Sequence, residues 1–383
     1  MQHHLYNPKF KFIKNPLNFN KYTDKELLQY CLGATLYMPG TKKFTQSILS
    51  KKEPGLTSMV MCFEDAIAEN SLYEAEKNVL EVLFNISVAI DSGKISYDDI
   101  PLIFLRVRNY QQFKSFSEKL SEKHVKVLTG FVFPKFNSIN GDAYLEHLNK
   151  LNTGYNEILY GMPILESKEV IFKESRKNEL LSIQALLNEF KNLILNIRIG
   201  ATDLSSWFGV RRGINYTIYD ILPVRDCISD ILNFLNRHNN DYVIAAPVWE
   251  YFLANKTMKF EDKLDTNIHR SLIKRSSIID DAVDGLMREV ILDKANGLVG
   301  KTVIHPTHIK FVNAMQAVTK EEYEDAHQIL DTSGGVVKSS KANKMNEINP
   351  HRSWAKKIYQ KAKAYGVIEN EDDYIKLLIT SYE

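Results

Sequence analysis

Cysteine is scarce in this chain. Cys31, Cys62 and Cys227 are the only three cysteines among 383 residues, and no two of them have a Cys-x-x-Cys spacing. An odd and scattered set favours reduced thiols over a disulfide framework, and it argues against zinc bound by cysteine. Because reduced thiols are typical of the cytoplasm, we expect a cytoplasmic protein.

An excess of charge of one sign and long apolar runs are also missing. Lys and Arg together number 49, and Asp and Glu number 47. This balance gives no global field that would favour nucleic acid. No run approaches the ~20 apolar residues needed to span a bilayer, and residues 1–22 lack the apolar core of a signal peptide. We therefore expect a soluble protein that acts on a small molecule and binds neither nucleic acid nor membrane.

The chain does contain eight short apolar runs, and most neighbouring runs are separated by an amphipathic stretch. The runs are 34–38, 58–63, 102–105, 127–133, 158–165, 194–199, 242–246 and 302–304. The stretches that we predict as helices are 71–89, 111–123, 180–194, 219–235 and 276–292. Ser71 and Glu74 form a capping-box pattern at the start of the first helix. Alternating strands and helices predict a parallel sheet, and eight such units predict an α/β fold, the (β/α)8 TIM barrel, over residues 31–331.

The pattern changes at both ends of this barrel. Residues 1–30 are predicted to form an N-terminal extension. After a last helix, predicted from the capping box at Thr319 to Leu330, Ser333-Gly334-Gly335 interrupts the chain. A lysine-rich segment and an amphipathic region over 353–382 then predict a helical C-terminal extension, residues 332–383. The lysines could hold a phosphate or a carboxylate, but a solvated helix face is the favoured interpretation.

Charged side chains follow several of the predicted strands. Glu64 and Asp65 follow the second run, Arg106 the third, Glu166 the fifth and Asp203 the sixth. Since all strands of a parallel barrel point their C-terminal ends at one mouth, these residues are predicted to converge there. Such a group of acids and an arginine suits a metal ion and an anionic substrate.

Motifs around these residues resemble, in order, those of the HpcH/HpaI aldolase and citrate lyase β-subunit family. The resemblance covers residues 34–330, and the tail around Lys344-Met345-Asn346-Glu347 is similar to a branch described with tellurium-resistance gene clusters. The matching motifs are Leu36-Tyr37-Met38-Pro39-Gly40, Phe63-Glu64-Asp65-Ala66-Ile67, Leu105-Arg106-Val107-Arg108, Phe133-Pro134-Lys135, Ile164-Leu165-Glu166-Ser167, Gly200-Ala201-Thr202-Asp203-Leu204 and Gly300-Lys301-Thr302-Val303-Ile304-His305-Pro306.

The resemblance implies a carbon-carbon bond lyase whose two metal ligands are Glu166 and Asp203. Breaking a carbon-carbon bond beside a carbonyl produces an enolate, and a divalent cation can stabilise its charge as a Lewis acid. Mg²⁺ suits this role because it prefers oxygen ligands and commonly takes only one or two protein carboxylates. Mn²⁺ is the alternative metal. A lone acid at either position would more often cap a helix or pair with a surface lysine.

Further residues are predicted to contact the substrate or the metal-bound waters at the mouth of the barrel. Arg106 is predicted to bind the substrate carboxylate or the enolate oxygen through its fork of donors, or to form a structural ion pair with Glu64 or Asp65. The resemblance places Glu64 and Asp65 beside the metal-bound waters. Because consecutive residues on an extended strand point to opposite faces, we expect at most one of them to face inward unless the backbone turns. Lys135, Gly200 and His305 are predicted substrate contacts, with structural roles as the alternative for Lys135 and His305.

Three positions depart from the family pattern. Cys62 stands where the family has an acid, and Arg108 stands where it often has asparagine, so we expect both to alter the charge of the mouth. In the tail, Glu347 stands where the family has an aspartate that acts in the site of a neighbouring subunit. Glu347 is therefore a candidate catalytic residue that implies a homo-oligomer, and an ordinary surface acid is the alternative.

Together these residues predict a Mg²⁺-dependent carbon-carbon lyase that cleaves or forms a bond next to the carbonyl of a carboxylate substrate. The substrate is a 2-oxo acid or an acyl thioester, and its partner is a coenzyme A thioester, a carrier-protein thioester or a free aldehyde. The alternative is a catalytically altered TIM barrel that binds a metabolite as a scaffold or regulator. Nucleic-acid binding through the lysine-rich tail is the least favoured interpretation.

Overall fold

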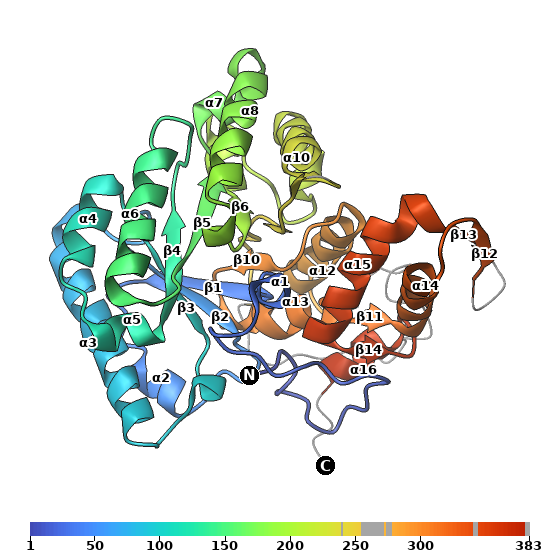
Figure 1. Ribbon diagram of the computed structural model, residues 1–383, viewed down its shortest axis with the longest axis horizontal. Helices are drawn as coiled ribbons and strands as arrows, with labels where there is room; N and C mark the ends of the chain where they lie inside the picture. Colours follow the sequence, from blue (N-terminus) through green and yellow to red (C-terminus); the bar gives the residue numbers. More distant parts are fainter. Residues whose placement is uncertain (239, 254–271, 273–277, 340–343, 380–383) are drawn as a thin grey trace.

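An eight-stranded parallel sheet forms the centre of the computed structural model, which describes residues 1–238, 240–253, 272, 278–339 and 344–379. The strand order is β10-β1-β2-β3-β4-β5-β6-β9, and every pairing is parallel. A further parallel bridge between Ala246 and Lys301 joins the two ends of the sheet, so the sheet closes on itself (Figure 1). The predicted (β/α)8 TIM barrel is confirmed.

Each of the eight predicted strands coincides with a strand of the barrel. Most differences are at strand ends, and the sheet is thinnest at β6 and β9, where few residues pair. The strands are β1 (Ala34–Pro39), β2 (Ser58–Cys62), β3 (Leu102–Arg106), β4 (Leu128–Phe133), β5 (Tyr160–Leu165), β6 (Ile197–Ile199), β9 (Ile244–Ala245) and β10 (Lys301–Val303).

Helices surround this sheet (Figure 1). They are α2 (Thr45–Leu49), α3 (Leu72–Asp91), α4 (Tyr110–Ser117), α5 (Glu122–Val127), α6 (Gly141–Tyr155), α7 (Lys168–Ile171), α8 (Lys173–Glu189), α9 (Ala201–Ser206), α10 (Leu222–Leu235), α12 (Asp281–Ala295) and α13 (Ile309–Gln316). The helix predicted over 111–123 is two helices, α4 and α5. The chain restarts at Ser121, whose side chain and backbone N–H contact His124 Nδ1 in a capping box. Helices α2, α6, α7, α9 and α13 were not predicted. Residues 276 and 277 of the last predicted barrel helix lie outside the described residues, and α12 begins at Asp281.

Side chains along the strands alternate between the barrel interior and the surrounding helices. Met59, Leu105 and Phe131 point outward into the core formed with the helices. Val60, Phe104, Val132, Met162 and Val243 belong to a separate interior cluster, which also contains Met1, Phe19 and Leu28 of the N-terminal segment. Apolar side chains thus fill the half of the barrel interior near the N-terminal ends of the strands. Charged side chains lie in the half near the C-terminal ends.

The N-terminal segment is tied to the C-terminal part of the chain. His3 contacts the carbonyl oxygens of Cys31 and Ala364, and His4 contacts that of Tyr365. Both histidines are buried. The short helix α1 (Lys25–Leu28) follows in the chain before β1. The first residues therefore act as a packed element that joins the barrel to the C-terminal helices (Figure 1).

The C-terminal part packs as a helical unit. It contains β11 (Val318–Thr319), α14 (Lys320–Asp331), β12 (Val336–Lys338), β13 (Met345–Glu347), α15 (Ile348–Tyr365), β14 (Val367–Ile368) and α16 (Asp373–Leu378). Ala326 and Ile329 of α14 share a core cluster with Ala355 and Ile358 of α15. The extension is therefore helical as predicted, although α14 packs with it. The domain limits at residues 30 and 331 stay predictions.

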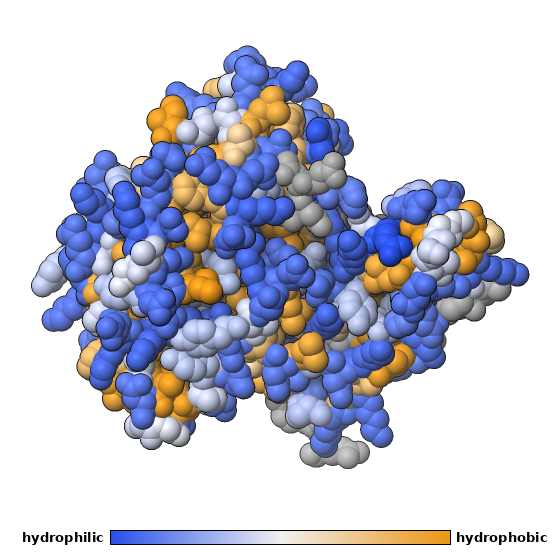
Figure 2. Space-filling view, viewed as in Figure 1, coloured by the Kyte–Doolittle hydropathy of each residue, from blue (hydrophilic) through white to orange (hydrophobic). Residues whose placement is uncertain are grey.

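The lysine-rich tail is partly tied into this unit. Lys344 pairs with Glu321 at 3.0 Å and with Asp325 at 2.7 Å, and Lys361 is buried. Lys341 lies outside the described residues. The face of the molecule in Figure 2 is mainly hydrophilic, with apolar residues scattered over it. Among the described residues, we find no helix with the length and apolar character that a membrane crossing needs.

Candidate active site

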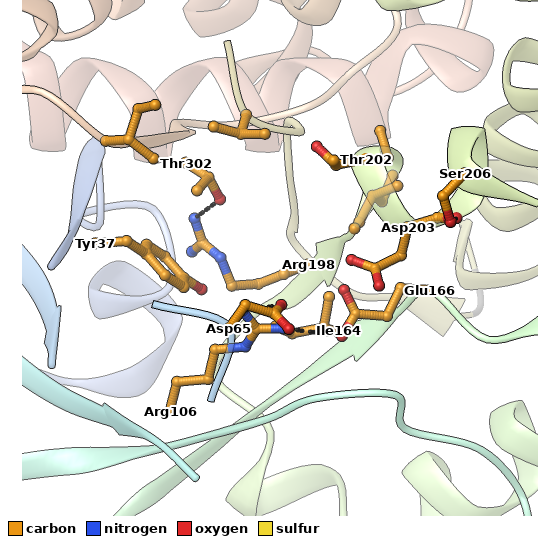
Figure 3. A pocket seen from close by; sticks show the side chains of 15 residues that line it. Tyr37, Asp65, Arg106, Ile164, Glu166, Arg198, Thr202, Asp203, Ser206 and Thr302 are labelled. Atoms are coloured by element: carbon orange, nitrogen blue, oxygen red, sulfur yellow. Dashed lines mark hydrogen bonds and ion pairs between the residues drawn. The ribbon is translucent and has the colours of Figure 1, made fainter. Parts of the chain in front are cut away.

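A cavity of about 390 Å³ lies at the C-terminal ends of the barrel strands. Its volume is within the range of small-molecule sites, roughly 300–1,000 Å³. Figure 3 shows charged side chains from several strands pointing into it. The lining residues are Tyr37, Asp65, Arg106, Ile164, Glu166, Arg198, Ile199, Gly200, Ala201, Thr202, Asp203, Ser206, Val248, Thr302 and Ile304.

Arg106 connects three acids at one wall of this cavity. Its Nη2 lies 2.7 Å from Glu64 Oε2 and 3.2 Å from Glu166 Oε1, and its Nη1 lies 3.0 Å from Asp65 Oδ2. Burial alone would lower the pKa of the guanidinium, but Glu166 and the other nearby acidic groups raise it above its usual value. Arg106 is therefore permanently charged and held in one orientation.

Glu64 and Asp65 both reach Arg106, because the backbone turns after β2, which is the exception that the expected alternation allowed for. Strand β2 ends at Cys62, and the chain bends directly after it. The backbone amide of Asp65 donates to Glu64 Oε2 at 3.0 Å, which stabilises the bend. The alternation of an extended strand no longer applies after Cys62. Of the two acids, only Asp65 lines the cavity.

Glu166 is the most buried acid of the site, with 3% of its surface exposed. It follows β5 directly, and its Oε1 accepts a hydrogen bond from the backbone amide of Lys135 at 2.9 Å. Burial raises its pKa to about 7; Arg106 opposes this shift and Asp203 adds to it. A nearby cation would stabilise the ionised form of such a buried carboxylate, because the cation offsets the cost of burying the negative charge.

Asp203 lines the same cavity from the first turn of α9, which follows β6. In Figure 3 the carboxylates of Asp203 and Glu166 point toward each other. Gly200 lies beside them, at the position before α9. A Cβ on Gly200 would stand 2.0 Å from Glu166 Oε2, so glycine is required for this close approach.

Lys135 and His305 lie at the edge of the site and do not line the cavity. Lys135 has a positive φ of 49°, and its Nζ contacts Glu64 Oε1 at 2.5 Å. Burial opposes the protonated form, but the hydrogen bond to Glu64 raises the pKa of the ammonium group. His305 stacks on Phe252 with 4.6 Å between ring centroids, and its Nδ1 contacts Thr307 Oγ1. In this arrangement His305 braces the loop after β10.

Cys62 and Arg108, which depart from the family pattern, contact the chain segment that carries Glu64 and Asp65. Cys62 is buried and lies 3.3 Å from the backbone amide of Glu64. Arg108 donates to the carbonyl oxygens of Phe63 and Ile67, at 3.0 and 3.1 Å. Neither residue lines the cavity. Arg108 thereby braces the bend that carries Glu64 and Asp65.

Glu347 lies at the end of β13, in the C-terminal unit, and its side chain is exposed. It is not among the residues that line the cavity. A role for it in a neighbouring subunit stays a prediction, as does the homo-oligomer.

Sequence reasoning missed two large polar residues of the cavity, Tyr37 and Arg198. Arg198 lies in the middle of β6, and its Nη2 donates to Thr302 Oγ1 at 2.7 Å. Its guanidinium carbon lies 5.4 Å from the centre of the Tyr37 ring. Both residues were hidden inside apolar runs. The available signal was an arginine at an inward-facing position of a short strand, two residues before Gly200.

The described residues contain no group of three or more His, Cys, Asp or Glu side chains that could hold a metal. The donor set at the cavity still fits Mg²⁺, because that ion commonly takes only one or two protein carboxylates and keeps several waters. Glu166 and Asp203 are the two that face each other.

The model of a protein family described as C-C bond lyase of the TIM-barrel fold matches residues 26–367. The chain belongs to this family. No curated protein sequence matches it.

Solved structures are similar to this chain at low sequence identity. CitE from Mycobacterium tuberculosis, in complex with magnesium, acetoacetate and coenzyme A, is 15% identical with a TM-score of 0.50 and covers 87% of this chain and 99% of its own. Malate synthase from Haloferax volcanii is 14% identical with a TM-score of 0.48, over 73% of this chain and 69% of its own. RipC from Yersinia pestis is 15% identical with a TM-score of 0.46, over 75% and 95%. At this identity the likeness to CitE concerns the fold alone.

Proposed function

We propose that this member of the C-C bond lyase family is a Mg²⁺-dependent enzyme that cleaves or forms a carbon-carbon bond next to the carbonyl of a carboxylate substrate. The observation that carries the proposal is the pairing of Glu166 and Asp203 in one cavity at the C-terminal ends of the strands. Active sites of TIM-barrel enzymes lie at this end. The family match over residues 26–367 supports the reaction class.

Glu166 and Asp203 would hold the metal. When bound, Mg²⁺ supplies a Lewis acid that stabilises the negative charge of an enolate. The CitE structure named above contains magnesium, which agrees with this choice. Mn²⁺, which also prefers oxygen ligands, would be tolerated in the same site.

Arg106 would orient the acids and face the substrate. Two of its nitrogen atoms are engaged by Glu64, Asp65 and Glu166, while its buried Nε has no hydrogen-bond partner. A fixed positive charge in the cavity favours the developing enolate oxygen over the neutral carbonyl, and this preference lowers the barrier. Burial raises the pKa of Glu64, and Lys135, which contacts Glu64 at 2.5 Å, would oppose this shift and favour the ionised form.

Calorimetric titration of Mg²⁺ tests the proposal. The purified protein is titrated with and without pyruvate, glyoxylate and oxaloacetate, and the titration is repeated with Asp203→Ala and Glu166→Ala. We expect Mg²⁺ to bind more tightly in the presence of one of these 2-oxo acids. Each variant should lose the metal while keeping its fold, because both acids lie at the mouth and outside the apolar barrel layers.

The matched control is Asp142→Ala, which removes an acid from the first turn of α6, away from the cavity lining. Unchanged Mg²⁺ binding in Asp203→Ala or Glu166→Ala would contradict the metal assignment. Metal binding in the wild-type protein without turnover of any carboxylate substrate would favour the metabolite-binding scaffold instead.

A further inference from the structure

The two arginines of the cavity differ in their surroundings. Arg106 has three carboxylates within 3.2 Å. Arg198 forms no ion pair with any residue that the structure describes, although only 1% of its surface is exposed. Its hydrogen bonds are to Thr302 Oγ1 at 2.7 Å and Thr35 Oγ1 at 3.4 Å, its guanidinium carbon lies 5.4 Å from the centre of the Tyr37 ring, and its Nε has no hydrogen-bond partner.

An arrangement of this kind is costly for the protein alone. A charge that is removed from water loses several kcal/mol of hydration unless a partner of opposite charge replaces the water. Two threonine hydroxyls and the Tyr37 ring, none of which carries a negative charge, replace only part of it. Costs of this size persist where a ligand compensates for them, so an unpaired buried arginine in a cavity wall indicates a place for an anion.

The position of Arg198 separates this place from the metal-binding acids. In Figure 3 the guanidinium points toward Thr302 and away from Glu166 and Asp203, and Tyr37 points its hydroxyl group toward the same region. All five residues line one cavity. A substrate whose 2-oxo acid group is held at Glu166 and Asp203 would therefore present a different part of itself to Arg198.

We propose that Arg198, with Thr302 and Tyr37, forms an anion-binding subsite that takes a second carboxylate of the substrate, remote from the 2-oxo acid group. The substrate class is then a small 2-oxo dicarboxylic acid. The dicarboxylate identification rests on the proposed function, whereas the subsite itself does not. The hydroxyl of Thr302 and the fork of the guanidinium offer donors that suit the two oxygens of a carboxylate.

The first experiment tests the subsite without metal. Succinate, which has two carboxylates and no 2-oxo group, is titrated into the full-length protein in the presence of a chelator at constant ionic strength. We expect the wild-type protein to bind succinate and Arg198→Met to lose at least about tenfold in affinity, as expected when a charge-assisted contact is removed. Equal binding by both proteins would overturn the proposal.

The second experiment tests the substrate class with Mg²⁺ present. The wild-type protein should bind oxaloacetate at least about tenfold more tightly than pyruvate. In Arg198→Met this preference should disappear, because oxaloacetate falls to the affinity of pyruvate while Mg²⁺ binding stays unchanged. A preference that survives in the variant would overturn the proposal. Failure of both proteins to bind Mg²⁺ would contradict the proposed function, and the succinate result would still decide the subsite.

Thermal unfolding separates a ligand-binding role from a structural one. Removal of a buried charge that lacks an acidic partner should leave the melting temperature of Arg198→Met unchanged or raise it. Arg176→Met is the matched control, because Arg176 is buried but pairs with Asp230 at 2.8 Å and donates to Val170. We expect this control to lower the melting temperature and to leave succinate binding intact. A loss of melting temperature in Arg198→Met as large as in the control would assign Arg198 to the fold and overturn the proposal.

Discussion

Gly200 and Glu166 are in such close contact that no side chain fits between them. A Cβ on Gly200 would stand 2.0 Å from Glu166 Oε2 and 2.6 Å from Glu166 Cβ. The backbone before α9 thereby fixes the position of a carboxylate that belongs to β5. Since Asp203 follows Gly200 within the same turn, the contact also sets how the two acids face each other.

Gly200→Ala should lower the affinity for Mg²⁺ while leaving the fold intact. The φ and ψ of Gly200 are −90° and 70°, close to the inverse γ-turn conformation, which does not require glycine, so the fold should be kept. The added methyl group must displace the Glu166 carboxylate, and Mg²⁺ affinity should fall by about tenfold or more, as expected when a metal ligand is misplaced. Calorimetry measures the affinity, and circular dichroism checks the fold. Wild-type affinity in Gly200→Ala would show that Glu166 does not bind the metal in this orientation.

Arg106→Lys should lower the rate of the reaction more than it lowers metal binding. A lysine keeps the charge but cannot contact Glu64, Asp65 and Glu166 at once, because it lacks the planar fork. We expect kcat to fall by roughly 100-fold or more, by analogy with the removal of one charge-stabilising donor from an active site. Steady-state kinetics at saturating Mg²⁺ measures this effect. A variant with the kcat of the wild-type protein would exclude Arg106 from stabilising the transition state.

His308 should make the protein sensitive to acid. Its Nε2 contacts the carbonyl oxygen of Tyr251 at 2.9 Å, while its buried Nδ1 has no partner. Burial lowers its pKa to about 4, below the ordinary value of 6.5. The unfolded chain therefore binds the proton first, so the free energy of unfolding is at its full value above pH 6.5 and decreases as the pH falls toward 4.

The expected loss between pH 7 and pH 5 is about 2 kcal/mol for this one histidine. Urea unfolding at the two pH values measures it. His308→Gln keeps a side-chain donor for Tyr251 but does not titrate, so its free energy of unfolding should depend less on pH. An identical pH dependence in the variant would show that folding does not shift the pKa of His308.

Glu289 should be essential for stability. It is buried on α12 and contacts Lys301 at 2.8 Å as well as Arg212. Removal of one member of a buried ion pair leaves an unpaired charge and typically costs about 3–5 kcal/mol. We expect Glu289→Gln to lose stability of this order in urea unfolding. Glu146→Gln, which breaks the exposed pair with Lys150, is the control and should change stability by less than about 1 kcal/mol. Equal effects of the two variants would contradict the account.

The barrel could be predicted from the sequence because its strands are short apolar runs and its helices are amphipathic. The positions of Arg106, Glu166 and Asp203 followed from the same rule, since a residue at the end of a parallel strand lies at the shared mouth. What the rule could not give is the local geometry. The bend after Cys62 depends on a hydrogen bond between the neighbouring residues Asp65 and Glu64, and no sequence pattern marked it.

Arg198 and His3 show a second reason why parts of the structure escaped prediction. Arg198 lies between two isoleucines and was counted as part of an apolar run. His3 was counted as part of a polar extension, yet it is buried and contacts Ala364 at the other end of the chain. In both cases the surroundings come from distant segments, so neither burial nor partner can be read from the local sequence.

Proton exchange on a 2-oxo acid tests the central claim most directly, because exchange of the hydrogens next to the carbonyl requires an enolate. Pyruvate and 2-oxoglutarate are incubated in D₂O with the protein and Mg²⁺, and loss of the C3 proton signal is followed by NMR. We predict that the wild-type protein accelerates exchange for at least one of the two acids, and that a chelator or Asp203→Ala abolishes the acceleration. Exchange at the uncatalysed rate with both acids, in a wild-type protein that binds Mg²⁺, would contradict the assignment of enolate chemistry to this site.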